Sequence, residues 1–381
     1  MKNSIETLDL SVDLEKEQYD WKKDVIVNKA KLLEKIDEAD NLGDVIKIKR
    51  DISEIKSIVN YPRSDREGLL NIDQDGDAVV LKRGVFLEEL TQIEEAHTIE
   101  RAKYYLDRLK KGVSEIKTSK VNDINLNRWK EYEDIITDSL WVLEKRDSSG
   151  AHLGHYWGNF VPQIPHQLML RYTKKDDWVL DPFVGSGTTL IECRRLGRNG
   201  VGVELVPEVV REAKDLIRKE ENIHNVSTEI ITGDSRKVNL KDALDQRNQK
   251  KFQLIIMHPP YHDIIKFSRN QDDLSNAPST DDFVRMFGEV LDNTTPYLEK
   301  GRYLGIVIGD KYHKGTWIPL GFYIMNEVLK RDFTLKSIII KNFEETRGKR
   351  NQKELWRYRA LVGGFYIFKH EYILLFKSVK K

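Results

Sequence analysis

Residues 181–189 read DPFVGSGTT and form the most distinctive local motif in the second half of the chain. It follows a short apolar run at 178–180 and precedes a segment compatible with a helix at 188–196. A Gly-x-Gly turn between a strand and a helix lets the backbone approach a ligand closely and exposes the first amides of the helix. No Gly-Lys-Ser/Thr follows, so the turn is not a Walker loop, and the third glycine of a dinucleotide fingerprint is missing. The stretch therefore predicts a ligand-binding turn at one edge of a sheet.

Acidic residues stand at the ends of three successive expected strands. Asp181 ends the first, Glu204 ends the second and Asp234 ends the third. The carboxyl ends of parallel strands meet at one edge, and an acid about 20 residues beyond such a turn binds ribose hydroxyls. Three helix-capping acids are the alternative. The ordered series favours a cofactor that contains ribose.

Short β-rich runs alternate with helical segments through this half of the chain. The expected strands span residues 178–180, 200–203, 227–232, 252–257, 303–308, 334–341 and 371–377. The expected helices between them include residues 188–196, 207–221 and 280–298. This alternation predicts a mostly parallel sheet with helices on both faces. The last two strands have no full helix between them, so we expect them to pair antiparallel around a long inserted loop.

A second motif follows the fourth strand, where residues 255–261 read IIMHPPY. A buried strand that ends at two prolines leaves the sheet abruptly, because neither proline donates a ladder hydrogen bond. The turn is expected to present His258, the Pro259 carbonyl and the Tyr261 ring beside the glycine turn. Acceptor atoms hold the hydrogens of an amino group, and an aromatic face stacks on a planar base. The alternative is a rigid turn with a packed tyrosine.

The first part of the chain differs in charge and pattern. Residues 1–125 hold 22 basic and 27 acidic residues, whereas residues 126–381 hold 41 and 35. Apolar residues recur there at spacings of three and four, which predicts two or three helices around a loop at 60–77. We expect an α-helical docking domain over 1–125 and the motif-bearing domain over 126–381.

Composition excludes several classes of protein. The 63 Lys+Arg nearly balance the 62 Asp+Glu, so the chain is neither a globally basic nucleic-acid coat protein nor an acidic tail protein. A single cysteine, Cys193, excludes an intrachain disulfide framework and a cysteine-cluster metal site. His152, His155 and His166 lack the further ligands that would complete a metal site, so none is expected. No apolar run has the length of a bilayer span and the N-terminus lacks a secretory core, so a cytoplasmic protein is expected.

Together the two motifs resemble the N-4/N-6 DNA methylase family of S-adenosylmethionine-dependent amino-methyltransferases. The resemblance covers roughly residues 141–381. Residues 160–166, FVPQIPH, resemble the additional cofactor-site segment of that family, and residues 369–376, KHEYILLF, its last strand. It implies an α/β, Rossmann-like methyltransferase sheet, mostly parallel with an antiparallel last strand, preceded by the α-helical domain.

The resemblance also implies roles for residues. The methionine part of S-adenosylmethionine would face Asp181 and the turn at 183–187, the ribose hydroxyls would meet Glu204, and adenine would meet Asp234. The implied cofactor-binding residues are Asp181, Pro182, Phe183, Gly185, Ser186, Gly187, Thr188, Glu204 and Asp234. The implied catalytic residues are His258, Pro259, Pro260 and Tyr261. The target base would be flipped out of the duplex and stacked on Tyr261, because its amino group is unreachable inside the helix.

One position departs from the family, which usually has Asp, Asn or Ser where this chain has His258. A neutral histidine accepts one hydrogen bond through one ring nitrogen, but it cannot act as a carboxylate. Because it is neutral, as serine is, it favours cytosine N4 weakly over adenine N6, and both targets stay open.

Residues 346–359, TRGKRNQKELWRYR, form a basic segment with interleaved aromatics. Basic side chains neutralise phosphates and aromatic rings stack on bases. The expected nucleic-acid contacts are Arg347, Lys349, Arg350, Lys353, Trp356 and Arg357. The alternative is a solvated loop in which Trp356 packs on the sheet edge. A second candidate for DNA contact is the segment 262–279.

These observations predict a site-specific methyltransferase acting on double-stranded DNA in a restriction-modification or other defence system. A cognate restriction or defence protein would dock on the N-terminal helices. Two alternatives remain: an RNA amino-methyltransferase acting on guanine or adenine, and a non-catalytic subunit that only binds a partner.

Overall fold

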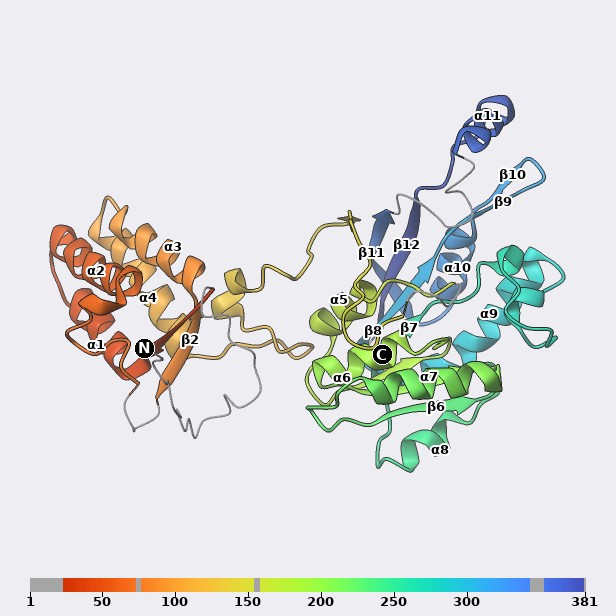
Figure 1. The fold of residues 1–381 in the computed structure, drawn as a ribbon, viewed down its shortest axis with the longest axis horizontal. Helices are drawn as coiled ribbons and strands as arrows, with labels where there is room; N and C mark the ends of the chain where they lie inside the picture. Colours follow the sequence, from red (N-terminus) through yellow and green to blue (C-terminus); the bar gives the residue numbers. More distant parts are fainter. Residues whose placement is uncertain (1–22, 73–76, 154–157, 343–352, 380–381) are drawn as a thin grey trace, which may run out of the picture. The chain divides into compact units, whose positions relative to one another are not determined.

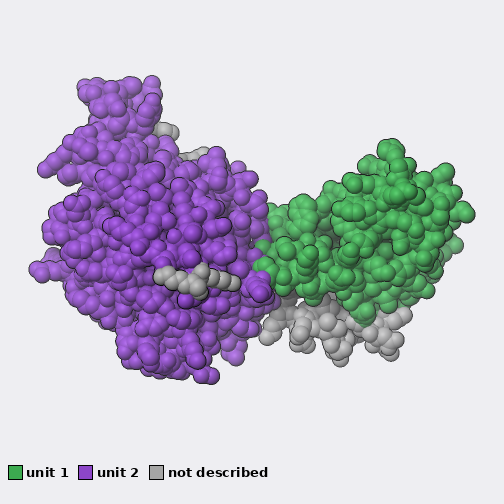
Figure 2. All heavy atoms as spheres, turned by 180° about the vertical axis from the view of Figure 1, so that it is seen from behind, with its two compact units in different colours: residues 1–119, 124–134 green, residues 120–123, 135–381 purple. Residues whose placement is uncertain are grey.

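The computed structural model describes residues 23–72, 77–153, 158–342 and 353–379. The chain forms two compact units, and Figure 2 shows them in different colours. Unit 1 contains residues 1–119 and 124–134, and unit 2 contains residues 120–123 and 135–381. The expected domain boundary at 125/126 lies in the stretch where the chain passes between the units.

Unit 1 is mainly helical and has its own apolar core. Its helices are α1 (Lys29–Asp40), α2 (Val45–Asn60), α3 (Arg83–Glu94) and α4 (Ile99–Ser114), with 3₁₀ turns at Pro62–Ser64 and Leu126–Glu131. Strand β1 (Asp24–Asn28) pairs antiparallel with β2 (Ala78–Lys82). The expectation of two or three helices was too low. Apolar residues recur at helical spacing from residue 85 to residue 109, but Thr98 begins a new helix within this range by accepting a hydrogen bond from the Arg101 amide.

Unit 2 is built on an eight-stranded sheet in the order β3-β11-β12-β8-β7-β4-β5-β6. The strands are β3 (Leu140–Trp141), β4 (Trp178–Asp181), β5 (Asn199–Glu204), β6 (Thr228–Thr232), β7 (Phe252–Met257), β8 (Leu298–Ile308), β11 (Phe333–Asn342) and β12 (His370–Ser378). Neighbours from β6 to β8 are parallel, whereas β12 runs antiparallel to both β8 and β11. The predicted α/β fold, including its antiparallel last strand, is confirmed.

Helices cover both faces of this sheet (Figure 1). One apolar cluster joins Val179 of β4 to α5 (Gln163–Tyr172), α6 (Thr188–Leu196) and α7 (Pro207–Lys219). The other joins the next residue, Leu180, to α8 (Leu240–Asp245), α9 (Thr280–Thr294) and α10 (Leu320–Leu329). Successive strand residues point to opposite faces, so β4 is buried on both sides.

Two additions rise from the edge that carries the glycine turn. The hairpin of β9 (Lys311–His313) and β10 (Thr316–Ile318) follows β8, and α11 (Lys353–Gly363) lies between β11 and β12. Figure 1 shows both at the same end of unit 2. The rings of Tyr312 and Phe365 stack with centroids 4.2 Å apart, which joins β9 to the segment that follows α11. The expectation of a loop over 346–359 was wrong from Lys353 onward, where the chain is helical.

None of the helices in the described part of the chain is long and apolar enough to cross a membrane.

Candidate active site

A cavity of about 290 Å³ opens at the carboxyl edge of the sheet and brings the two sequence motifs together. Parts of residues 158–161 and 264–274 complete its wall, as do Lys341 and Glu371. The predicted residues that line it are Pro182, Phe183, Gly185, Ser186, Glu204, Asp234, His258, Pro259, Pro260 and Tyr261. Asp181, Gly187 and Thr188 were also predicted, but they are not part of its lining.

The glycine turn has a backbone that only glycine adopts readily. Gly185 has φ of 49° and Gly187 has φ of 89°, both in the left-handed region. A Cβ atom on Gly187 would lie 2.9 Å from Cδ1 of Ile217. Glycine at these two positions lets the backbone make a tight turn between β4 and α6.

Asp181 lies beneath this turn and is fully buried. Its Oδ1 accepts a hydrogen bond from the Phe183 amide at 2.9 Å, and its Oδ2 accepts one from the Thr189 hydroxyl at 2.5 Å. Burial raises the pKa of Asp181 to about 7. The side chain therefore holds the shape of the turn and does not itself line the cavity.

Glu204 ends β5 and faces the cavity. Its Oε1 accepts the Val206 amide at 2.9 Å, which fixes the direction of the carboxylate. Burial raises the pKa of Glu204 above its ordinary value. A carboxylate in this position can accept hydrogen bonds from two neighbouring hydroxyls.

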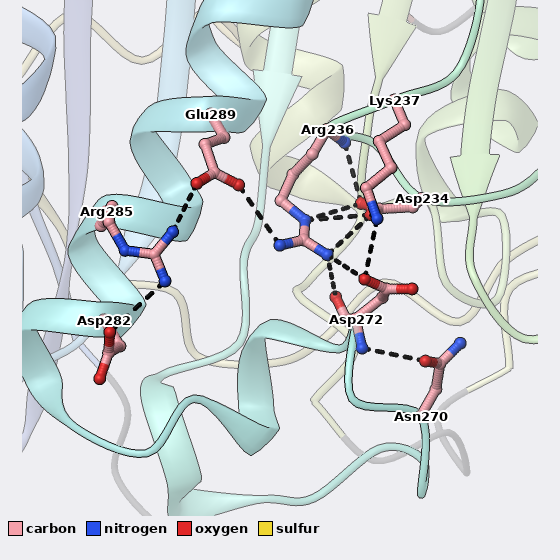
Figure 3. A network of polar contacts seen from close by, with 8 residues as sticks. All are labelled: Asp234, Arg236, Lys237, Asn270, Asp272, Asp282, Arg285 and Glu289. Carbon is pink, nitrogen blue, oxygen red and sulfur yellow. Dashed lines mark hydrogen bonds and ion pairs between the residues drawn. The ribbon is translucent and has the colours of Figure 1, made fainter.

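Asp234 is held in a network of charged side chains (Figure 3). The Nε of Arg236 lies 3.0 Å from both Asp234 oxygens, and Nη2 of Arg236 lies 2.5 Å from Oδ1 of Asp272. Glu289 of α9 contacts the same guanidinium at 3.3 Å. Asp272 belongs to the predicted DNA-contact segment 262–279, so this network holds that segment on the Asp234 side of the cavity.

The His-Pro-Pro-Tyr turn meets the last two strands. The Tyr261 hydroxyl donates to Oε2 of Glu371 at 2.8 Å and lies 3.2 Å from Nε2 of His258. Oε1 of Glu371 pairs with Nζ of Lys341 at 3.1 Å. Burial lowers the pKa of His258 to about 4 and raises the pKa of Tyr261, so both are neutral at pH 7.

The ring positions in this turn are set by packing. The His258 ring lies against Phe160, with centroids 4.9 Å apart. The Tyr261 ring lies against Gly309, where an added Cβ would approach the ring to 2.8 Å. Gly309 therefore leaves the room that the tyrosine ring occupies.

Sequence reasoning missed Lys341 and Glu371 as site residues. Both lie in runs that read as strand, and they face each other across the β11–β12 pair. The signal was a charged residue at the active edge of each strand, directly beside an apolar run, 338–340 before Lys341 and 372–376 after Glu371.

The structure places the predicted nucleic-acid residues only in part. Trp356 and Arg357 lie in α11, and Arg357 is exposed. Lys353 is the first residue of the same helix. Arg347, Lys349 and Arg350 fall outside the described residues. No α11 residue lines the cavity.

Two of the sequence-neighbouring histidines share one buried carboxylate. Nε2 of His152 lies 2.6 Å from Oε1 of Glu192, and Nδ1 of His166 lies 2.7 Å from Oε2. Glu192 belongs to α6, so these bonds attach the chain before the cavity to the helix after the glycine turn. No group of described residues has the composition of a metal site.

We expect Glu192→Gln to lower the free energy of unfolding at pH 7 by about 3 kcal/mol, since removing one charge of a buried pair leaves its partners uncompensated. Burial alone would raise the pKa of Glu192, but the hydrogen bonds from His152 and His166 outweigh it and lower the pKa from 4.5 to about 2. The stabilisation is thus present above pH 4.5 and lost as the pH falls towards 2.

Urea unfolding at pH 7 and at lower pH measures this effect. Glu208→Gln, which removes an exposed carboxylate of α7, is the control and should change stability little. Equal losses in the two variants would contradict the role given to Glu192.

Comparison with known proteins identifies a family. A family model described as DNA methylase matches residues 28–215, a range that contains the glycine turn and Glu204 and ends before His258. Type II methyltransferase M.MjaII of Methanocaldococcus jannaschii is 36% identical over 86 residues, 20% of this chain and 16% of that protein. M.Cfr9I of Citrobacter freundii is 35% identical over 83 residues, 22% of this chain and 26% of that protein.

A third relative, M2.LlaDCHI of Lactococcus lactis, is 36% identical over 93 residues, 24% of this chain and 33% of that protein. The matching segments thus span one third or less of the length of these relatives. Among solved structures, TrmN from Thermus thermophilus aligns with a TM-score of 0.37 and 12% identity, over 58% of this chain and 49% of that chain.

The family model covers the glycine turn, and the relatives are Type II methyltransferases, which agrees with the resemblance drawn from the sequence. The match to the DNA methylase model and the Type II methyltransferase relatives support the N4/N6 DNA methylase family, whose cofactor is S-adenosylmethionine, as the family of this chain.

Proposed function

We propose that this protein transfers a methyl group from S-adenosylmethionine to an exocyclic amino group of a base in double-stranded DNA. The observation that carries the proposal is that the glycine turn and the His258–Tyr261 turn line one cavity. A site that holds a cofactor and an amino group side by side removes most of the entropic cost of bringing them together.

The residues of the cavity fit the cofactor. The turn at 183–187 brings its backbone to the cavity just before α6, Glu204 offers a carboxylate for the ribose hydroxyls, and Asp234 also lines the cavity. Asp234 is bound to Arg236, so a base there would meet an acid whose direction is already fixed. When bound, S-adenosylmethionine supplies the electrophilic methyl group.

The His258–Tyr261 turn would hold the target. His258 and the Pro259 carbonyl would accept the amino hydrogens and aim the nitrogen lone pair at the methyl group. Tyr261 would offer its ring to the flipped base, since base–aromatic stacking offsets part of the cost of leaving the duplex.

We assign cytosine N4 as the target amino group, because His258 is neutral at pH 7.

Trp356 and Arg357 of α11, at the same edge of the sheet as the cavity, would contact DNA. We place the protein in the cytoplasm, in a restriction-modification or other defence system, with unit 1 docking a cognate partner protein.

The test is mass spectrometry of nucleosides from duplex DNA incubated with the protein and S-adenosylmethionine, with RNA as a parallel substrate. N4-methylcytosine from DNA is the expected product. N6-methyladenine would support DNA amino-methyl transfer but show that adenine is the target base. Methylation of RNA alone would support the RNA alternative, and the absence of any methylated product would overturn the proposal.

We expect a fragment of residues 120–381 to bind S-adenosylmethionine with the affinity of the full chain, because every lining residue of the cavity belongs to unit 2. The fragment keeps residues 120–123, in which the Asn122 amide donates to the Arg171 carbonyl at 2.8 Å and Asp123 accepts the Lys175 amide at 2.6 Å. Calorimetry measures the affinity.

A fragment of residues 135–381 is the matched control. It lacks these bonds and should be less stable, with the cavity residues unchanged. A folded 120–381 fragment that does not bind the cofactor would show that unit 1 takes part in the site.

A further inference from the structure

A carboxylate lies behind the His258–Tyr261 turn, although the turn itself contains none. Glu371 is 8% exposed and stands near the start of β12, directly opposite Lys341 of β11. One of its oxygens pairs with the Lys341 ammonium, and the other accepts a hydrogen bond from the Tyr261 hydroxyl. Both Glu371 and Lys341 line the cavity, so the pair belongs to the site and not only to the sheet.

The hydrogens of this chain of contacts can be assigned. A carboxylate paired with an ammonium only accepts hydrogen bonds, so the single hydrogen of the Tyr261 hydroxyl points to Glu371. The Tyr261 oxygen then has only lone pairs to offer to His258. The contact of 3.2 Å between that oxygen and Nε2 of His258 is a hydrogen bond only if Nε2 carries the hydrogen.

A neutral imidazole carries one hydrogen, and burial keeps His258 neutral at pH 7. With the hydrogen on Nε2, the lone pair is on Nδ1. Among the residues that the structure describes, Nδ1 of His258 has no hydrogen-bond partner. The ring therefore keeps one free acceptor in a cavity wall.

We propose that Glu371 is a positioning residue that acts through Tyr261 to fix His258 as the Nε2–H tautomer, which leaves Nδ1 to accept a hydrogen of the substrate amino group. This inference rests on the proposed amino-methyl transfer and extends it. It explains how a histidine serves at a position where the family usually has Asp, Asn or Ser. The carboxylate comes from another strand and sets the direction of the hydrogen bonds.

Glu371→Gln tests the proposal, because Lys341 dictates which way the new amide faces. The ammonium of Lys341 needs the amide oxygen, so the NH₂ group turns to Tyr261 and donates to its oxygen. The Tyr261 hydrogen must then point to His258, whose Nε2 becomes the acceptor and whose Nδ1 takes the hydrogen. The variant thus reverses the tautomer without removing any side-chain volume.

Nitrogen-15 NMR of the full-length protein with labelled histidine reads the tautomer, and His258→Gln assigns the signal. We expect the wild type to show the Nε2–H form and Glu371→Gln to show the Nδ1–H form. The rate constant for methyl transfer should fall about 100-fold, since a histidine in the wrong tautomer presents a hydrogen where a lone pair is needed. Affinity for S-adenosylmethionine should stay unchanged.

Two variants serve as controls. Glu327→Gln breaks another largely buried ion pair, on α10, and should leave both the His258 signal and the rate unchanged. In the background of Tyr261→Phe, which has no hydroxyl to relay the effect, Glu371→Gln should change the rate little further.

An Nδ1–H signal in the wild type, or a Glu371→Gln variant with the wild-type rate, would overturn the inference. The NMR result does not depend on activity. If the wild type shows the Nε2–H form but methylates no nucleic acid, the hydrogen-bond assignment holds and the proposed function fails, and with it the role given to Nδ1.

Discussion

Gly185→Trp should abolish binding of S-adenosylmethionine while the protein stays folded. Gly185 has φ of 49°, which a side chain strains, and it lines the cavity. An indole there would also occupy much of a cavity of about 290 Å³. Calorimetry measures the affinity and circular dichroism verifies the fold.

Gly315→Trp is the matched control for this change. Gly315 has φ of 83°, also left-handed, but a Cβ there meets no atom within 4 Å. It carries the same backbone strain in open space and should bind the cofactor normally. Unchanged affinity in a folded Gly185→Trp variant would contradict the cofactor assignment of the glycine turn.

Asp181→Ala should likewise abolish cofactor binding, but from below the turn. The substitution removes the acceptor of both the Phe183 amide and the Thr189 hydroxyl, so the backbone that carries Gly185 loses its support. The sequence indicated that Asp181 matters; the structure shows that it acts on the shape of the turn.

The parallel sheet was predictable because its strands are short, apolar and separated by helices with a clear period. The strand 252–257 and the helix 188–196 were predicted with the bounds that the structure has. Elements without a clear apolar run or a clear helical period were missed. Strand β9 has only three residues, and α11 follows directly on a highly charged stretch that reads as loop.

The carboxylate that contacts the His258–Tyr261 turn was not predictable from spacing along the chain. His258 and Tyr261 lie three residues apart, so a local motif reveals them. Glu371 lies 110 residues beyond Tyr261 and reaches it only because β12 is inserted antiparallel beside β8. The order of strands in the sheet, which the sequence pattern does not fix, determines which distant side chains join the site.

The ring of Tyr261 is fixed before any base arrives. Its hydroxyl is bonded to Glu371, and one part of the ring packs on Gly309. Pro259 and Pro260 restrict the backbone of the turn that carries it. A base that flips into the cavity would therefore meet an ordered surface, and little side-chain entropy would be lost on stacking.

Tyr261→Ala should consequently lower methyl transfer to duplex DNA by about 10- to 100-fold, because stacking on one aromatic ring contributes roughly 1–3 kcal/mol per base and 1.4 kcal/mol is a factor of ten. Affinity for S-adenosylmethionine should hardly change, since Glu204 ends β5 and Asp234 follows β6, both away from the turn that carries Tyr261. Tyr261→Phe keeps the ring and should retain much more activity than Tyr261→Ala. It loses the hydroxyl that orders His258, so its rate should lie between those of Tyr261→Ala and the wild type. Tritiated methyl transfer, measured beside cofactor calorimetry, separates these effects, and a wild-type rate for Tyr261→Ala would mean that the turn is structural and that the base binds elsewhere.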